Sequence, residues 1–558
     1  MQAHIAIVKL PSVIPESSPL WGGPIILNPG GPGGSGVAFA LQKGEAIQKV
    51  VGEKYSIIGF DPRGVNNTIP QISCFRNSVE RRVWHAKGGG KVLNSTGALG
   101  NESLLVELGE LYARSFIRAR LCIEQNSKIV EYLGTPSTAR DMHILSRAEW
   151  EGKIDIAGNP RSKGLQYWGF SYGSVLGITF AAMFPDEVER IVVDGVVKTR
   201  DYYRLGWSTN LYDADAVMDS FYEYCSLAGP LRCPFHTGTT PKDIQTRLES
   251  LLDFVKKNPV PAVLLDPYGV NNGEGLQPDL ITYSDLKTII FTALYQPLAT
   301  FPALAEILVA VESRKPTALV DYKTMFDIKS FITCRAPVPP GAGLAPLTPP
   351  DNLHAHEATS AILCSDGTPL SPTLTAQDFL PYISFLRSQS RTSADPWAQI
   401  RLSCVGWKAQ AREKPPKILT RDTPPHHGSK LRPRNPVLLV NTDRDPVTPV
   451  RNAFLMREWF EEGKAGLLVQ EGVGHCSVRS PSLCAARVLR EYFEEGKVPR
   501  GNWEPGSKGY GWCGIASRPF LGDVTQGYEI KDDLLQSVEM VGEAVADLGR
   551  VRATEWAY

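Results

Sequence analysis

Short apolar runs alternate with helix-like segments in the first part of the chain. Strand-like runs occupy residues 5–10, 24–28, 55–60, 165–170 and 190–194. Apolar runs of this length, each followed by a polar or glycine-bearing turn, are typical of buried parallel strands, and the segments between them have helical spacing. The pattern predicts an α/β fold with a mostly parallel sheet flanked by helices.

This rhythm stops near residue 200 and returns near residue 430. The sequence in between is mostly helix-like and loop-like and includes a proline-rich stretch at 336–350. Strand-like runs then reappear at 436–442 and 467–470, followed by a helix expected over 482–495. A sheet domain interrupted by a mainly helical insertion accounts for this order with the fewest assumptions.

The predicted organisation therefore has four parts. Residues 1–199 form the first part of the core, residues 200–430 a helical cap or lid, and residues 431–515 the second part of the core. Residues 516–558 form a C-terminal extension. Its apolar residues recur at steps of three and four, which predicts one amphipathic helix: Ile530, Leu534, Val538, Val541, Val545 and Leu548.

Ser171 stands between a predicted strand and a predicted helix. It lies in Gly169-Phe170-Ser171-Tyr172-Gly173, a G-x-S-x-G pattern. In a nucleophile elbow this pattern holds a serine on a strained strand-to-helix turn, and the small residues let the two backbones approach closely. The context predicts that Ser171 is a nucleophile, whereas the pattern outside such a context would describe an ordinary surface serine.

A glycine-rich loop, Pro29 to Gly36, follows the strand at 24–28. Glycines leave backbone N–H groups uncovered and permit positive φ, which suits a loop that presents amides to an oxyanion. Gly31-x-Gly33-x-x-Gly36, with Asp61 ending the next strand, also matches a dinucleotide-binding fingerprint. That alternative places Pro32 inside the tight turn and leaves Ser171 unexplained.

Two further strands end in titratable residues. Asp445 follows the strand at 436–442, and His475 follows the strand at 467–470. Groups just past the carboxyl ends of parallel strands line one crevice, so Ser171, Asp445 and His475 can converge there. Their chain order, Ser then Asp then His, is the order of the α/β-hydrolase triad. Asp443 is a competing candidate for the acid.

Charge and composition restrict the classes of molecule that this protein is expected to bind. The 558 residues carry 59 Lys and Arg against 59 Asp and Glu, so no net field favours nucleic acid or an anionic membrane. No window is apolar enough for a membrane helix, and the first thirty residues lack the apolar core of a signal peptide. The expected partner is a peptide or small molecule, and the oligomeric state is open.

Cysteine spacing leaves two interpretations open. The ten cysteines show no paired C-x-x-C spacing, so we expect no metal site. They are either buried thiols or disulfides formed in an oxidising compartment. They stand at positions 74, 122, 225, 233, 334, 364, 404, 476, 484 and 513.

Several segments together resemble the tripeptidyl aminopeptidase branch of the proline iminopeptidase-like serine peptidases. Besides the two glycine motifs, the matching segments are Gly59-Phe60-Asp61-Pro62-Arg63-Gly64, Thr138-Ala139-Arg140-Asp141, Asp445-Pro446-Val447-Thr448-Pro449 and Gly474-His475. The resemblance implies an α/β-hydrolase fold with a helical cap. It also implies a triad of Ser171 as nucleophile, Asp445 as orienting acid and His475 as base, with the Gly31 and Tyr172 amides as oxyanion hole.

The resemblance also bears on the cysteines and on location. It suggests the pairs Cys74 with Cys122, Cys225 with Cys233, Cys364 with Cys404, and Cys484 with Cys513, which leaves Cys334 and Cys476 outside the scheme. Such pairs, and the secretion of family members, imply that this protein is secreted. Family members carry a signal peptide before the position where this chain begins.

The sequence thus predicts a serine hydrolase that works through an acyl-enzyme and releases short peptides from free N-termini, with no cofactor or metal. Carboxylates in the cap would have to bind the substrate's α-amine, and Asp213, Asp215, Asp219 and Glu223 are candidates. Two alternatives are a hydrolase of a natural-product ester, lactone or amide, and a non-catalytic binding protein on the same fold.

Overall fold

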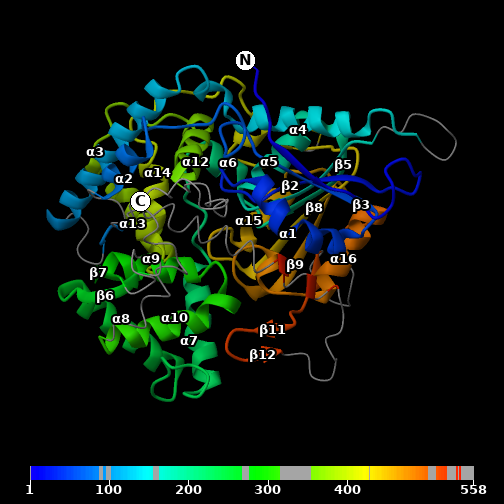
Figure 1. Cartoon of the computed structure of the whole chain (residues 1–558). Coiled ribbons are helices and arrows are strands. Elements are labelled where there is room, and N and C mark those ends of the chain that lie inside the picture. Colours follow the sequence, from blue (N-terminus) through cyan, green and yellow to red (C-terminus); the bar gives the residue numbers. More distant parts are fainter. Residues whose placement is uncertain are drawn as a thin grey trace, which may run out of the picture.

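The computed structural model is organised around an eight-stranded sheet with strand order β1-β3-β2-β4-β5-β8-β9-β10 (Figure 1). It describes residues 2–86, 92–95, 102–154, 163–266, 275–314, 353–426, 428–499 and 510–523, and positions 534, 536, 537, 540 and 541. The strands are β1 (Ile7–Leu10), β2 (Gly23–Asn28), β3 (Tyr55–Phe60), β4 (Leu165–Phe170), β5 (Val188–Asp194), β8 (Val437–Arg444), β9 (Ala465–Val473) and β10 (Gly511–Cys513).

The pairing of these strands confirms the predicted sheet. Only the edge strand β1 runs antiparallel, against β3, and each other neighbouring pair is parallel. The sequence prediction did not include β10. This strand has three residues, too few to show a period, and it is defined by its pairing with Leu468 to Gln470 of β9.

Alternating side chains of the strands bury both faces of the sheet. In β2, Ile25 and Leu27 join the core on one face and Ile26 joins the core on the other. Because successive side chains of a strand point to opposite faces, a strand buried on both sides reads as a continuous apolar run. The core that contains Ile25 and Leu27 includes α1 (Gly36–Val51) and α16 (Leu483–Glu495). The core that contains Ile26 includes α4 (Thr135–Trp150), α5 (Tyr172–Met183) and α15 (Val450–Arg457).

The segment between β5 and β8 is mainly helical but divides into two packing groups beside the sheet (Figure 1). The helices α7 (Ala214–Ala228), α8 (Pro241–Lys257), α9 (Tyr283–Ala293) and α10 (Pro297–Glu312) share most of a separate apolar core. The helices α12 (Leu353–Asp366), α13 (Leu380–Gln389) and α14 (Ala394–Leu402), together with α2 (Ser78–Ala86) and α3 (Glu102–Gln125), join the core of one sheet face.

Within the first group lies a β-hairpin that the sequence prediction missed. Strand β6 (Val260–Asp266) pairs antiparallel with β7 (Gly275–Ile281). Val260 and Ile281, at the open end of the hairpin, are buried in the core formed with α7 to α10. A second short hairpin, β11 (Ser517–Arg518) with β12 (Gly522–Asp523), follows the sheet.

The structure contains the four disulfides that the family resemblance suggested: Cys74–Cys122, Cys225–Cys233, Cys364–Cys404 and Cys484–Cys513. Two of them join separate elements, α12 to the end of α14 and α16 to β10. Disulfides in this number are typical of proteins that fold in an oxidising compartment. Cys334 lies outside the described residues, and Cys476 is a buried thiol.

Two sequence predictions fall largely outside the described residues, namely the proline-rich stretch at 336–350 and the C-terminal amphipathic helix at 530–548. Leu534 and Val541 from the latter are described, and both pack against the sheet core that contains α1 and α16. No helix in the described part of the chain combines the length and apolar character needed to cross a membrane.

Asp194, at the carboxyl end of β5, ties two neighbouring loops together. Its backbone carbonyl accepts a hydrogen bond from the Ser171 amide at 2.8 Å. Its carboxylate accepts hydrogen bonds from the Ser477 amide at 2.8 Å and the Ser477 hydroxyl at 2.5 Å. The side chain is fully buried, and burial raises the pKa of Asp194 to about 7 against the lowering effect of Ser477.

We expect the free energy of unfolding to depend on pH, because the pKa of Asp194 is higher in the folded protein than in the unfolded chain. Burial raises the pKa of Asp194 from 3.8 to about 7, so the protonated carboxyl favours the folded state. This contribution is fully present below pH 4 and is lost as the pH rises through 7. It amounts to roughly 4 kcal/mol. The stability advantage of the wild type over Asp194→Asn should therefore shrink between pH 4 and pH 8 in urea unfolding.

Asp243→Asn is the control, because hydrogen bonds from Thr240 lower the pKa of this carboxylate at the start of α8. Its stability difference from wild type should be flat above pH 5. A flat difference for Asp194→Asn as well would show that the buried carboxyl has an ordinary pKa.

Candidate active site

Ser171 occupies the turn between β4 and α5, with φ of 57° and ψ of −119°. Such a conformation is strained for a residue with a side chain, and it is the conformation of a nucleophile elbow. Hydrogen bonds from the Ser174 amide and hydroxyl to the Ser171 carbonyl, at 2.8 and 2.5 Å, hold the turn together with the bond to Asp194. The predicted strand, turn and helix around Ser171 are confirmed.

The two glycines of the elbow are required by close packing. A Cβ on Gly169 would lie 2.2 Å from the Tyr167 hydroxyl oxygen, and one on Gly173 would lie 3.0 Å from the Asn28 carbonyl oxygen. The first contact is impossible without displacing Tyr167, and the second is tighter than ordinary packing. The G-x-S-x-G pattern therefore has glycines where β4, α5 and β2 approach one another closely beside the serine.

The glycine-rich loop lies beside the elbow. Gly30, Gly31 and Gly33 have φ between 95° and 116°, and the Asn28 side chain accepts a hydrogen bond from the Gly30 amide at 2.9 Å. Gly31 and Tyr172, the two expected oxyanion donors, line the same pocket as Ser171.

Asp61 has a structural role in this part of the site. One of its carboxylate oxygens accepts from the Ser35 hydroxyl at 2.6 Å and the Val37 amide at 3.2 Å, and the other accepts from the Asn67 amide at 3.1 Å. Ser35 in turn caps α1. In the dinucleotide hypothesis Asp61 would bind a ribose, but here it fixes the glycine loop against the start of α1.

Asp445 lies in the loop after β8 and is fully buried. Its oxygens accept hydrogen bonds from the amides of Val447, Thr448 and Cys476 at 2.7 to 3.0 Å and from the Thr448 hydroxyl at 2.7 Å. Burial alone would raise the pKa of Asp445, but His475 and these amide donors outweigh it and the pKa is lowered. Asp445 is therefore ionised at neutral pH.

His475, in the loop after β9, is oriented by Asp445. Its Nδ1 lies 3.0 Å from both carboxylate oxygens and 3.2 Å from the Thr448 hydroxyl, and its amide donates to the Tyr295 carbonyl at 3.0 Å. With the Nδ1 proton donated to Asp445, the basic lone pair is on Nε2. Nε2 has no hydrogen-bond partner among the described residues and is available to a substrate or nucleophile.

The loops that carry Ser171 and His475 both contact the end of β5. Gly195, directly after Asp194, has φ of 70°, and a Cβ there would lie 3.4 Å from the His475 ring and 3.0 Å from the Thr448 hydroxyl. Asp194 meanwhile accepts from the Ser171 amide. Ser171, Asp445 and His475 therefore lie in loops that follow the carboxyl ends of β4, β8 and β9.

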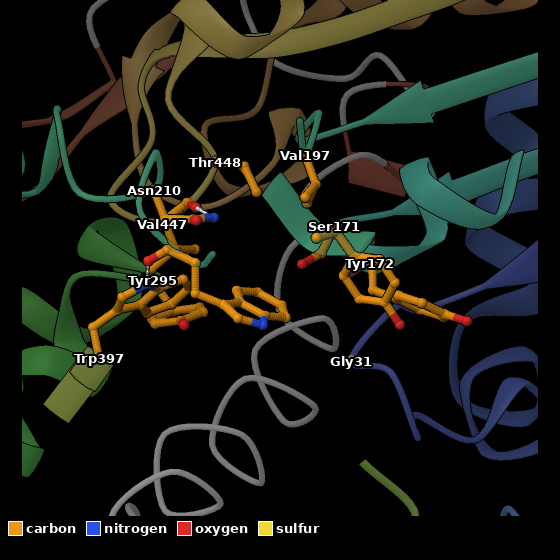
Figure 2. A pocket seen from close by; sticks show the side chains of 11 residues that line it. Gly31, Ser171, Tyr172, Val197, Asn210, Tyr295, Trp397, Val447 and Thr448 are labelled. Carbon is orange, nitrogen blue, oxygen red and sulfur yellow. Dashed lines mark hydrogen bonds between the residues drawn. The ribbon is translucent and has the colours of Figure 1, made fainter. Parts of the chain in front are cut away.

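A pocket with about 400 Å³ of empty space, partly open to solvent, lies over Ser171. Figure 2 shows Ser171 and Tyr172 on one side and Tyr295, Trp397 and Asn210 on the other. Its walls are largely aromatic: Tyr172, Tyr202, Trp207, Tyr295 and Trp397. The His475 ring packs edge-on against Tyr295 with centroids 5.2 Å apart, which places the histidine against this wall.

Among the described residues, a metal could meet ligand atoms within 4.8 Å of one another at Asp445, His475 and Cys476. The carboxylate is the acceptor for His475, and the Cys476 thiol donates to the Asp194 carbonyl at 3.4 Å. Hydrogen bonds within the protein therefore explain why Asp445, His475 and Cys476 lie close together.

The sequence prediction named other acids whose positions are now defined. Asp443 accepts from the Gly472 amide at 2.8 Å. Asp215 accepts from the Ser390 hydroxyl and two amides, and Glu223 lies 3.8 Å from Arg444. Together with Asp213 and Asp219, these acids are not among the residues that line the pocket.

Asp194, Thr448 and the aromatic wall were not predicted. Asp194 ends the strand-like run at 190–194, so the strand-end rule that found Asp445 could have found it. Thr448 stands three residues after Asp445 and could have been suspected from the turn. Tyr202, Tyr295 and Trp397 come from distant parts of the insertion, and no local pattern marks them.

Two family models match the chain. Residues 23–229 match the model described as alpha/beta hydrolase fold, and residues 390–505 match the model described as TAP-like protein. The first match contains Ser171 and the glycine loop, and the second contains Asp445 and His475.

Curated relatives agree with these matches. The tripeptidyl aminopeptidase of Streptomyces lividans is 29% identical over 245 residues, which cover 43% of this chain and 41% of the relative. The chain thus matches less than half the length of that relative. Serine protease Hip1 of Mycobacterium tuberculosis is 23% identical, and carboxylesterase B of the same species is 22% identical, each over 89% of this chain and 82% of the relative.

The family models and relatives agree with the observed sheet and strand-end loops. The chain has an α/β-hydrolase fold, and it is similar to a group of proteins that includes tripeptidyl aminopeptidases and a serine protease.

Proposed function

We propose that this protein is a serine hydrolase that cleaves peptides through an acyl-enzyme formed on Ser171. The observation that carries the proposal is the convergence of a serine on a strained elbow with a buried, ionised Asp445 that orients His475. A nucleophile, a base and a group that fixes the base are the parts that acyl transfer needs. Relatives named as peptidases favour a peptide substrate.

In the proposed reaction, Nε2 of His475 takes the Ser171 proton as the serine oxygen attacks the substrate carbonyl. The Gly31 and Tyr172 amides stabilise the resulting oxyanion. His475 then gives the proton to the leaving amine, and a water molecule hydrolyses the acyl-enzyme by the same route. Asp445 stays ionised and stabilises the imidazolium, which its lowered pKa supports.

A peptidase specific for free N-termini also needs an acceptor for the α-amine. No Asp or Glu stands among the pocket-lining residues in the described part of the chain. The α-amine would therefore be bound outside this pocket, which fits release of a short peptide better than release of a single residue. Among the four proposed acids, Asp213 keeps one carboxylate oxygen without a hydrogen-bond partner in the described residues.

Ester hydrolysis is the second candidate. The carboxylesterase relative spans as much of the chain as the protease relative does, and an uncharged aromatic pocket accepts an acyl chain of an ester as well as a side chain of a peptide. The same triad serves both reactions, because only the leaving group differs.

The first experiment compares a free-amine tripeptide anilide, its N-blocked twin and a simple aryl ester. We expect the wild type to turn over the free-amine peptide and Ser171→Ala to lose at least about 10³-fold in kcat. Ser313→Ala, which removes an exposed serine at the end of α10, should keep wild-type rates.

The pattern of turnover separates the alternatives. Ester turnover without peptide turnover would support the esterase, and failure of a fluorophosphonate probe to label Ser171 would support a non-catalytic binding protein. Turnover that survives Ser171→Ala would overturn the proposed mechanism.

A second experiment tests the acid. Asp445→Asn should lower kcat by about 10⁴-fold, because the asparagine no longer fixes the imidazole tautomer or stabilises the imidazolium. Asp443→Asn is the matched control two residues away and should stay within a few-fold of wild type, because the Asp443 carboxylate accepts from the Gly472 amide and not from the His475 ring in the described structure. Both are measured as kcat and KM on whichever substrate the wild type turns over; a larger loss in Asp443→Asn would reassign the acid.

A further inference from the structure

The segment from Arg204 to Asn210 forms part of the pocket wall in an unusual backbone conformation. It follows the short helix α6 (Thr199–Tyr203), and Trp207 and Asn210 line the pocket. Leu205 and Trp207 have φ of 54° and 48°, in the left-handed region that bulky side chains avoid. Both are nearly completely buried. Residues held in such conformations cost free energy and cluster at functional sites.

A single carboxylate holds this segment. Asp201 accepts hydrogen bonds from the Ser208 amide at 2.7 Å, the Ser208 hydroxyl at 2.8 Å, and the Thr209 amide and hydroxyl at 3.0 Å. A Cβ on Gly206 would lie 2.1 Å from an Asp201 oxygen, so the chain passes directly over the carboxylate. Charge-assisted bonds to consecutive residues can offset the backbone strain at Trp207.

Trp207 is also held by residues of α13 and α14. Its carbonyl accepts from the Tyr382 hydroxyl and from Trp397 Nε1, both at 3.0 Å. Its ring packs against Tyr202 and Trp397 with centroids 5.6 and 5.8 Å apart. The position of the ring in the pocket is therefore set by both its main chain and its neighbours.

The same segment reaches the loop of the triad acid. Asn210 Nδ2 donates to the Val447 carbonyl at 2.8 Å, and Asn452 Nδ2 donates to the Thr209 carbonyl at 3.1 Å. Val447 donates its amide to Asp445. Residues 204–210 thus join the aromatic wall from the insertion to the core loop that carries the acid.

We propose that residues 204–210 determine which acyl groups the pocket accepts, with Trp207 as the specificity-determining wall and Asp201 as the positioning residue behind it. The inference rests on the proposed function of Ser171 and names the substrate class. The group bonded to the reacting carbonyl is apolar and uncharged, and its size is limited by Trp207. Among the described residues no Asp, Glu, Lys or Arg lines the pocket, so a charged side chain would lose its hydration there without a partner.

The test uses two graded substrate series on the full-length protein. One is a set of free-amine tripeptide anilides whose third residue is Ala, Leu, Phe or Lys, and the other is a set of aryl esters of increasing acyl size. The variants are Trp207→Ala, Trp207→Phe and Asp201→Asn. Asp243→Asn is the matched control, because Asp243 also accepts from neighbouring Thr hydroxyl and amide groups but outside the pocket.

We expect wild type to prefer Leu or Phe over Lys by at least about tenfold in kcat/KM. Trp207→Ala should raise the ratio of the largest to the smallest uncharged acyl group by at least about tenfold, because it enlarges the pocket. Asp201→Asn should shift the ratio in the same direction by less, and Trp207→Phe and Asp243→Asn should keep the wild-type order. The shift should be mainly in KM, since the triad is untouched.

Each outcome has a defined meaning. An unchanged ratio in Trp207→Ala and Asp201→Asn, or a wild-type preference for Lys, overturns this inference while leaving the serine hydrolase intact. Absence of turnover in both series, or turnover that survives Ser171→Ala, overturns the proposed function and this inference with it. If Trp207→Ala fails to fold by near-ultraviolet circular dichroism, the Asp201→Asn ratio decides.

Discussion

The site depends on the carboxyl end of β5. There, one residue holds the serine loop with its main chain and the histidine loop with its side chain, through the bonds from the Ser171 amide and from Ser477 to Asp194. The next residue, Gly195, leaves no room for a Cβ beside Cys476, Thr448 and His475. Because the two loops follow strands β4 and β9, which lie on either side of β5 and β8, the sheet register fixes the relative position of Ser171 and His475.

The pocket is built differently from the triad. The residues of the proposed triad come from strand-end loops of the core. Tyr202, Trp207, Tyr295 and Trp397 come from the segment between β5 and β8. Hydrogen bonds join the two parts, from the His475 amide to the Tyr295 carbonyl and from Asn210 to the Val447 carbonyl. A fold of this kind can change the insertion and its acyl preference while the core keeps the chemistry.

These two origins explain how much could be predicted from the sequence. Ser171, Asp445 and His475 each follow a continuous apolar run, so local patterns mark them and the parallel sheet brings them together. The β6–β7 hairpin and β10 escaped prediction because their side chains give no clear period and their identity comes from pairing. The aromatic wall escaped because it is assembled from residues nearly two hundred positions apart, by tertiary contacts that leave no spacing in the sequence.

Two carboxyl groups buried beside the histidine loop have pKa values shifted in opposite directions, and the difference assigns their roles. Burial raises the pKa of Asp194 to about 7 and outweighs the hydrogen bonds that its carboxylate accepts from Ser477. Burial acts on Asp445 as well, but the imidazole of His475 and amides of Val447, Thr448 and Cys476 outweigh it and lower the pKa. Opposite environments for neighbouring acids separate the charged group from the neutral one. The negative charge is thus kept on Asp445, where it can stabilise an imidazolium, while Asp194 can hold the loops near neutral pH without a full second charge.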